Sequence, residues 1–179
     1  PFTYALAFEK GFTPASVLPD LPSHFPTAVE GVVYSPRNYD GAFRGPLRAR
    51  AALAGSENVP AVWLLSRVGV SDLLRLLRRL GFTTLEKTPE HYGFGLTMGD
   101  AEVGLAEVVA AYAVFARGGV FSRPRMIRAS WEADARKRPL PRSAPPERVI
   151  SPRAAYWVTD ILSDAKARAF AFGVGSSLD

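Results

Sequence analysis

The organisation of this chain depends on residues 47–65, which read Leu47-Arg-Ala-Arg-Ala-Ala-Leu-Ala-Gly55-Ser56-Glu57-Asn58-Val-Pro60-Ala-Val-Trp-Leu-Leu65. Leu47 to Leu53 has the pattern of one helix, and Gly55 is placed to close it in the left-handed conformation. Pro60 stands where a second helix can begin, because the first turn of a helix does not need its missing N–H. The sequence therefore predicts two helices joined by a short polar turn.

Ser56 and Asn58 stand two residues apart in this turn, so both side chains can project to the same side of it. One offers a hydroxyl and the other an amide, and both groups donate and accept hydrogen bonds. The same residue types are preferred as N-terminal caps of helices, and the residues alone favour that structural interpretation. A binding or catalytic role stays open beside it.

Composition places the chain among folded globular proteins. It has 179 residues, of which 47% are hydrophobic and 22% charged. The absence of cysteine excludes disulfides and thiolate chemistry. The net charge of +5 comes mainly from arginine, but no aromatic platform or reader motif accompanies the basic clusters, so we expect no nucleic-acid partner. The longest apolar runs are shorter than a membrane span.

Prolines and helix patterns divide the chain into parts. A loop-rich segment, a helical core, a hairpin with a last helix, and a truncated loop are expected in this order, at about 12–46, 47–120, 124–164 and 165–179. Within the third part, residues 125–131 resemble a strand and 147–150 are its expected partner. The last helix is predicted to open at Ser151-Pro152, with proline at its first position, and to run to about Asp164.

Two more helices are predicted within the helical core. Ser71 is expected to cap an amphipathic helix whose leucines form a buried stripe and which ends at Gly81. Leu105 to Arg117 has the clearest helix pattern of the chain and is stopped by two glycines. Its alanine-rich surface indicates a central, tightly packed helix.

Metal chemistry is not expected from this sequence. His24 and His91 are the only histidines, and neither has carboxylates at the spacing of metal ligands. We therefore predict no metal and no cofactor. A Ser-His-Asp triad is disfavoured for the same reason, with His91 left open as its one candidate.

Four separate segments resemble one known family. They read Asn38-Tyr-Asp-Gly-Ala-Phe-Arg-Gly, Arg48-Ala-Arg-Ala-Ala-Leu-Ala-Gly-Ser-Glu-Asn-Val-Pro-Ala-Val, Tyr92-Gly-Phe-Gly-Leu-Thr-Met-Gly-Asp-Ala-Glu-Val and Ala110-Ala-Tyr-Ala-Val-Phe-Ala-Arg-Gly-Gly. In their residues and in their order along the chain, these segments are similar to the transpeptidase module of class A penicillin-binding proteins, closest to its 1C subgroup. The resemblance covers roughly residues 1–120 well and the remainder loosely.

This resemblance implies an α+β fold of the β-lactamase/transpeptidase type, of which residues 1–179 are the central, helix-rich part with little of the sheet. The family combines a Ser-x-x-Lys motif, which supplies nucleophile and base, with a Ser-x-Asn turn and a Lys-Thr-Gly strand. By resemblance, Ser56 and Asn58 are the first and last residues of the Ser-x-Asn turn, which reverses the preference for a cap. Ser56 is then expected to relay a proton and Asn58 to orient the substrate's amide, while Glu57 faces away.

We expect the chain to contain neither Ser-x-x-Lys nor Lys-Thr-Gly. Residues 1–7 look like the family's sequence directly after the motif lysine, and residues 173–179 like the approach to the Lys-Thr-Gly strand. The 179 residues alone are therefore expected to be inactive. Pro1 is expected to open onto the Ser56–Asn58 turn, and Asp179 to end near the same cleft.

For the complete protein, the resemblance implies a serine-type D-Ala-D-Ala transpeptidase that cross-links peptidoglycan stem peptides and is inhibited by β-lactam antibiotics. It further implies an upstream glycosyltransferase domain that uses a lipid-linked precursor, an N-terminal membrane anchor, and a place in the bacterial envelope on the periplasmic face of the inner membrane. Other cell-wall synthesis proteins are possible partners.

Two alternatives remain open at the level of the sequence. A D,D-carboxypeptidase or β-lactamase-like serine hydrolase of the same fold would need the same turn. A non-catalytic scaffold would keep the fold without the nucleophile. The residues ahead of Pro1 distinguish these alternatives, because a Ser-x-x-Lys motif there indicates an enzyme.

Overall fold

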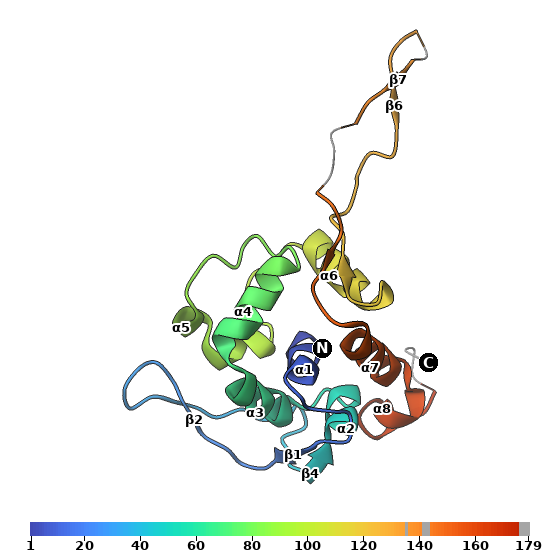
Figure 1. Ribbon diagram of the computed structural model, residues 1–179. Coiled ribbons are helices and arrows are strands. Elements are labelled where there is room, and N and C mark those ends of the chain that lie inside the picture. Colours follow the sequence, from blue (N-terminus) through green and yellow to red (C-terminus); the bar gives the residue numbers. More distant parts are fainter. Residues whose placement is uncertain (135, 141–143, 176–179) are drawn as a thin grey trace.

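The computed structural model describes residues 1–134, 136–140 and 144–175. Helices make up most of the body, and short strands lie at its edges (Figure 1). The helices are α1 (Phe2–Glu9), α2 (Ala49–Ala54), α3 (Asn58–Val68), α4 (Val70–Arg79), α5 (Pro89–Tyr92), the 3₁₀ helix η1 (Gly93–Thr97), α6 (Leu105–Ala116), α7 (Pro152–Ser163) and α8 (Ala165–Phe172). The expected helix-rich α+β organisation is confirmed.

Helix α1 occupies the centre of the helical body, where it packs against α3, α4 and α7 (Figure 1). Ala5 and Ala7 are fully buried, and Phe8 is almost fully buried. Small side chains let neighbouring helices approach closely, and interiors are packed densely enough to make use of that approach. Around α1 the described residues therefore form one continuous apolar core.

Helix α4 confirms the amphipathic pattern predicted after residue 70. The buried side chains of its apolar stripe are Leu73, Leu74, Leu76 and Leu77, and Leu80 is buried directly after the helix. The helix begins at Val70, so Ser71 lies inside it and does not cap it. Asp72 in the first turn pairs with Lys10 and Arg75, which ties the end of α1 to the start of α4.

Helix α6 has almost the predicted bounds, but its predicted central position is wrong. Leu105 is 79% exposed, Val109 is 63% exposed and Tyr112 is 42% exposed. The opposite face, with Ala111 and Val114, is buried and contacts α7. The alanines indicated close packing correctly, but the packing involves one face only.

The strands form two-stranded antiparallel sheets. In the loop-rich segment, β1 (Val17–Asp20) pairs with β4 (Gly45–Arg48), and β2 (Phe25–Pro26) pairs with β3 (Val33–Tyr34). Leu47 is opposite Leu18 in this register, so the helix expected from residue 47 begins only at Ala49. Prolines 19 and 46 face each other, which two edge strands tolerate because a residue on an edge need not donate an N–H to the ladder.

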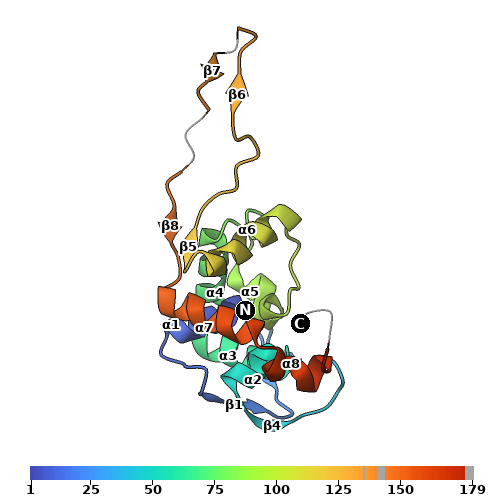
Figure 2. The ribbon, with the colours of Figure 1, turned by 90° about the vertical axis from the view of Figure 1, so that its right-hand side faces the viewer.

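The described residues between 120 and 148, namely 120–134, 136–140 and 144–148, leave the body as a long arm (Figures 1 and 2). At its base β5 (Val120–Phe121) pairs with β8 (Glu147–Arg148), and further out β6 (Ser130–Trp131) pairs with β7 (Lys137–Arg138). The expected pairing of 125–131 with 147–150 is therefore wrong. The chain already reverses near Glu132, whose N–H donates to the Arg136 carbonyl at 2.9 Å, so β6 meets the nearer residues.

The C-terminal part of the described chain contains one expected helix and one unexpected helix. Helix α7 begins as predicted, with Pro152 in its first turn and the Ser151 hydroxyl accepting from the Ala154 N–H. Residues 165–172, predicted to be a loop, form α8 instead. Asp164 caps it by accepting from the Ala167 N–H at 3.0 Å, and this capping residue was the local signal for a second helix. Asp179 lies outside the described residues.

Candidate functional site

The turn between α2 and α3 follows from the way α2 ends. The Ser56 N–H donates to the Leu53 carbonyl at 3.2 Å, and the Glu57 N–H donates to the Ala52 carbonyl at 3.0 Å. These two bonds form a Schellman motif, in which the first residue after the cap is left-handed. That residue is Ser56, with φ of 56°, and not Gly55, whose φ is −81°. The prediction that Gly55 adopts the left-handed conformation is wrong.

Gly55 has a packing role instead. A Cβ atom at this position would lie 2.3 Å from the Cζ atom of Phe170 on α8. Only glycine permits an approach this close without a shift of the aromatic ring. The left-handed step falls on the following residue, Ser56.

Ser56 is held in a backbone conformation that its residue type disfavours. Among the described residues it is the one non-glycine with positive φ. For an L-residue this conformation costs about 1–2 kcal/mol, and glycine is the usual occupant at such a helix end. The side chain is exposed, and no described residue forms a hydrogen bond with its hydroxyl. Backbone outliers of this kind cluster at functional sites.

The start of α3 shows that Ser56 does not cap the helix. Glu57 occupies the N-cap position and makes no capping bond with its side chain. The first free N–H groups, of Asn58 and Val59, both donate to Asn38 Oδ1, at 3.0 and 3.1 Å. The cap interpretation of Ser56 and Asn58 is therefore wrong, because Asn38 performs this role from the loop before α2.

The Asn58 side chain is fixed at one end and open at the other. Its Nδ2 donates to the Arg37 carbonyl at 2.8 Å, which sets the plane of the amide. No described residue bonds its Oδ1, and Asn58 lines the same cleft as Ser56. The turn thus offers a hydroxyl and an amide oxygen to a ligand.

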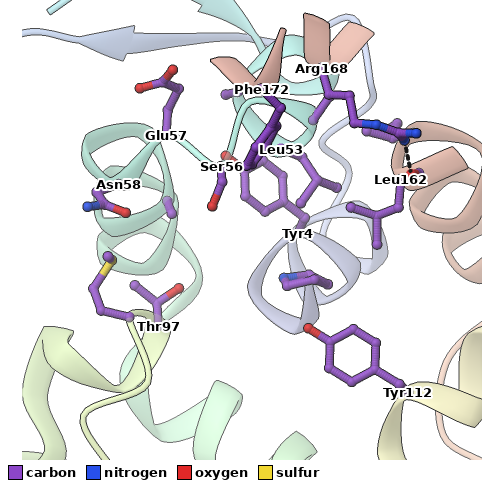
Figure 3. A pocket seen from close by; sticks show the side chains of 16 residues that line it. Tyr4, Leu53, Ser56, Glu57, Asn58, Thr97, Tyr112, Leu162, Arg168 and Phe172 are labelled. Atoms are coloured by element: carbon purple, nitrogen blue, oxygen red, sulfur yellow. Dashed lines mark hydrogen bonds between the residues drawn. The ribbon is translucent and has the colours of Figure 1, made fainter. Parts of the chain in front are cut away.

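Glu57 lies between these two residues and turns away from them, as predicted (Figure 3). Its carboxylate is buried and accepts from Arg44 Nη1 at 3.0 Å. Burial raises the pKa of Glu57, and the Arg44 charge acts in the opposite direction. Glu57 therefore anchors the turn to the loop before β4.

A cleft of about 450 Å³ joins this turn to distant parts of the chain (Figure 3). Its lining comes from α1, α2, α3, α6, α7, α8 and the end of η1, and includes Pro1, Tyr4, Leu53, Ser56, Asn58, Thr97, Tyr112, Leu162, Arg168 and Phe172. Pro1 and Ser56 therefore share one cleft, as expected. A second hollow, of about 390 Å³, also touches the turn and is lined by Tyr39, Arg44 and Phe170.

Sequence reasoning did not select two polar residues of this cleft. The Tyr4 hydroxyl is buried without a hydrogen-bond partner among the described residues. Burial raises the pKa of Tyr4 above its usual range, and the negative charge of Glu57 raises it further. The hydroxyl therefore keeps its proton and can donate a hydrogen bond. Thr97 Oγ1 is 2.6 Å from Thr3 Oγ1, which links η1 to α1. Thr97 lies in a segment that carries the family resemblance, whereas nothing in the helix pattern distinguished Tyr4.

Other candidates from the sequence lie elsewhere. His91 lies on α5 and does not line the cleft of Ser56. No group of three or more potential metal ligands occurs among the described residues. The expectation that the chain has no Ser-x-x-Lys is wrong as a statement about spacing, because Ser163-Asp-Ala-Lys166 has it. Both of its end residues are exposed, and the Ser163 hydroxyl donates to the Asp160 carbonyl at 3.1 Å, so this occurrence lies outside the cleft.

Comparisons with known proteins agree with this geometry. The family described as "Penicillin binding protein transpeptidase domain" matches residues 1–173. Penicillin-binding protein 1A of Neisseria meningitidis is 32% identical over 169 residues, which are 92% of this chain and 21% of that protein. Penicillin-binding protein 1A of Pseudomonas aeruginosa is 33% identical over 127 residues, which are 71% of this chain and 15% of that protein.

Solved structures show the same likeness. The crystal structure of penicillin-binding protein 1A from Haemophilus influenzae superposes with a TM-score of 0.77 and 26% identity, covering 91% of this chain and 28% of that one. The imipenem acyl-enzyme complex of penicillin-binding protein A from Mycobacterium tuberculosis gives a TM-score of 0.69 with 23% identity, covering 95% of this chain and 42% of that one. At that identity the second likeness concerns the fold alone.

The chain belongs to the family of penicillin-binding protein transpeptidase domains. It spans about a fifth of the length of the curated relatives it matches, 21% in the case of the Neisseria proteins. Those relatives carry the designation 1A, and the 1C subgroup stays a prediction.

Proposed function

We propose that residues 1–179 are the central part of a peptidoglycan D,D-transpeptidase module, which cross-links stem peptides through an acyl-serine intermediate. Membership of the transpeptidase family supports this reaction. Relatives of the same fold from M. tuberculosis have been solved as acyl-enzyme complexes with imipenem and penicillin G, which supports acylation by β-lactams. The peptidoglycan stem peptide is then the substrate that the antibiotic imitates.

The observation that carries the proposal is the state of Ser56. A helix end of this kind favours glycine, yet the chain has serine there in a left-handed conformation. Its hydroxyl faces a cleft and is unused by the described residues. A hydroxyl that does not cap, packs little and occupies a strained position fits a chemical role better than a structural one.

In this reaction a serine from a Ser-x-x-Lys motif outside this sequence attacks the carbonyl of the penultimate D-Ala. Its proton passes to the motif lysine. We assign Ser56 as the relay that returns a proton to the nitrogen of the departing D-Ala. In the second half, the amine of a neighbouring peptide attacks the acyl-serine, loses its proton through the same relay, and the serine leaves with that proton.

Asn58 is assigned a positioning role in contact with the substrate. Its Oδ1 has no partner among the described residues and can accept a hydrogen bond from the substrate's amide N–H or from the motif lysine. Because Arg37 fixes the other end of the amide, the acceptor is oriented before substrate arrives. Orientation of this kind lowers the barrier by removing motion that the transition state does not tolerate.

For the complete protein we propose an upstream glycosyltransferase domain that uses a lipid-linked precursor, an N-terminal membrane anchor and a location on the periplasmic face of the inner membrane. The family resemblance and the designation of the relatives support these assignments. Within the part of the chain that the structure describes, no helix has the length and apolarity needed to cross a bilayer.

The experiment is acylation of the full-length protein by a fluorescent penicillin, followed on denaturing gels over time. We expect Ser56→Ala to slow acylation by roughly a hundred- to ten-thousand-fold, the range expected for loss of a proton relay. Ser66→Ala is the matched control, because Ser66 lies on α3 and donates only to the Trp63 carbonyl. A polypeptide of the 179 residues alone is expected to stay unlabelled.

Each outcome separates the proposal from an alternative. Labelling of the full-length protein followed by rapid loss of the label in water, without transfer to an added amine, would indicate a hydrolase. Absence of any labelling in the full-length protein would indicate a scaffold. Wild-type acylation by the Ser56→Ala variant would remove Ser56 from the mechanism.

A further inference from the structure

A buried polar network lies beneath the Ser56–Asn58 turn. Among the described residues, Asp20, Asn38 and Glu57 belong to the few polar side chains that are less than a tenth exposed. They come from β1, from the loop that follows β3 and from the turn itself. Buried polar groups are costly unless they are hydrogen-bonded, so the partners of this network are informative.

Asn38 is the central member of this network. Its Oδ1 accepts from the backbone N–H groups of Asn58 and Val59, and these are donors that α3 leaves without an internal partner. Its Nδ2 donates to Asp20 Oδ1 at 2.7 Å and to the Ala42 carbonyl at 2.8 Å. Two accepted and two donated bonds use the capacity of the amide, and no other side chain of this length offers both.

The network continues from Asp20 to the other side of the turn. The second carboxylate oxygen of Asp20 accepts from the Arg44 N–H at 2.8 Å. The Arg44 guanidinium pairs with Glu57 at 3.0 Å and with Asp40 at 2.6 Å. The network therefore holds the backbone of the turn's last residue through Asn38 and the side chain of its middle residue through Arg44.

These contacts leave two groups of the turn uncommitted, and they are the two that face the cleft. The Ser56 hydroxyl and Asn58 Oδ1 make no hydrogen bond with the described residues. The other hydrogen bonds and the ion pair of the turn connect it to residues 37–44 or to the end of α2. A displacement of about 1 Å in such a turn is enough to slow a reaction substantially.

We propose that Asn38 is a positioning residue of the acyl-transfer site, which acts through the start of α3 to fix Ser56 and Asn58 for reaction. The inference rests on the proposed function. It gives Asn38 a role in the rate of the chemical step that is separate from its contribution to folding.

The test exchanges the two partners of the central bond in the full-length protein. Asn38→Asp keeps the acceptor for α3 but places a second carboxylate against Asp20, so both bonds that Nδ2 donates, to Asp20 and to the Ala42 carbonyl, are lost. Asp20→Asn with Asn38→Asp restores a donor facing an acceptor, now from residue 20 to residue 38, and keeps the net charge. Acylation by a fluorescent penicillin is measured at pH 8, with the pre-covalent dissociation constant and the acylation rate constant determined separately.

We expect Asn38→Asp to lower the acylation rate constant by about ten- to a hundred-fold with little change in the pre-covalent dissociation constant. The double exchange should recover part of that loss, because it restores the bond between residues 20 and 38 but not the bond to the Ala42 carbonyl. Leu74→Val is the control for stability, because Leu74 is buried in α4 away from the turn, and its acylation rate should equal that of the wild type. If Asn38→Asp does not fold, Asp20→Asn replaces it, because it weakens the same bond at its acceptor, and a lowered acylation rate constant with little change in the pre-covalent dissociation constant is again expected.

Three results would overturn this proposal. They are an unchanged acylation rate constant in folded Asn38→Asp, a loss that the double exchange does not recover, or an equal loss in Leu74→Val. The proposed function fails separately, if the wild-type protein is not acylated or if Ser56→Ala acylates at the wild-type rate.

Discussion

Helices α3 and α7 begin in different ways, and the difference explains why only the first leaves polar groups free for the proposed site. The N-terminus of helix α7 is capped by the residue directly ahead of it, since the Ser151 hydroxyl accepts from the Ala154 N–H at 3.1 Å. Helix α3 has no such local cap, and its first N–H groups bond Asn38 in a loop that is distant in sequence. A remote cap leaves the Ser56 hydroxyl and Asn58 Oδ1 without a partner among the described residues. The serine of one turn stabilises a helix, whereas the serine of the other faces a cleft.

The two arrangements also differ in what they require of the rest of the molecule. The start of α7 needs only consecutive residues, so it can form as soon as the helix does. The start of α3 needs β1, the loop at 37–44 and the turn to be docked together. A turn built in this way depends on tertiary structure, and its geometry is set by residues that are distant in sequence.

Apart from changes at Ser56 itself, the largest effect is expected from a change at Asn58, on the side of the α3 start that faces the cleft. Asn58→Ala removes the free amide oxygen but keeps the backbone N–H that bonds Asn38. We expect acylation of the full-length protein by a fluorescent penicillin to fall by roughly a hundred- to a thousand-fold. Stability should fall by only about 1 kcal/mol, for the lost bond to the Arg37 carbonyl.

Arg153→Ala, in the exposed first turn of α7, is the matched control and should acylate normally. The comparison fails if Asn58→Ala lowers the melting temperature and leaves the acylation rate at the wild-type value. Asn58 would then be an anchor for Arg37 and nothing more.

The opposite result is expected at the start of α7. Ser151→Ala removes a local cap and should lower the free energy of unfolding by about 1 kcal/mol. Acylation should be unchanged, because Ser151 does not line the cleft of Ser56. Denaturant unfolding compared with Ser163→Ala, whose exposed hydroxyl bonds only the Asp160 carbonyl, isolates the cap. Equal stability of Ser151→Ala and the wild type would show that the observed cap contributes nothing.

A smaller effect depends on pH and concerns the second local cap, Asp164 at the start of α8. A hydrogen bond from Arg50 holds the pKa of Asp164 below its ordinary value, with a further contribution from the Ala167 N–H. A carboxyl with a lowered pKa in the folded state stabilises the fold above its unfolded pKa, and this stabilisation is lost as pH falls through the folded pKa. Asp164→Asn should therefore melt below the wild type at pH 7, with a difference that shrinks below about pH 4.

Thermal unfolding from pH 7 to pH 3 measures this difference. Asp134→Asn removes the same charge from the arm and serves as the control. A difference between Asp164→Asn and the wild type that is constant across this range would contradict the assignment.

Local signals explain which parts of the fold the sequence predicts. Ser151-Pro152 predicts the start of α7, and the leucine stripe predicts α4, because both depend on neighbouring residues. The α8 helix was missed because its alanines and phenylalanines have no clear period, although Asp164 carried a capping signal. The β1–β4 pair was missed because its prolines argue against strands unless both partners are edges.

The candidate site also has features that the sequence predicts and features that it does not. Ser56 and Asn58 were identified from a motif, but their conformation was not predicted. The need for glycine at position 55 comes from Phe170, which reaches it from more than a hundred residues along the chain. Which residue caps α3 depends on Asn38 and its own partners. Contacts between segments that are distant in sequence have no local pattern, and so the sequence alone does not predict them.

The central claim is that Ser56 is kept for its hydroxyl and not for the fold, and Ser56→Gly tests it most directly. Glycine is favoured in the left-handed conformation that Ser56 adopts, so the substitution removes the hydroxyl and relieves the backbone together. For the full-length protein we predict a melting temperature equal to or above that of the wild type, with acylation by penicillin slowed by roughly a hundred- to ten-thousand-fold. A lowered melting temperature with an unchanged acylation rate would contradict the account.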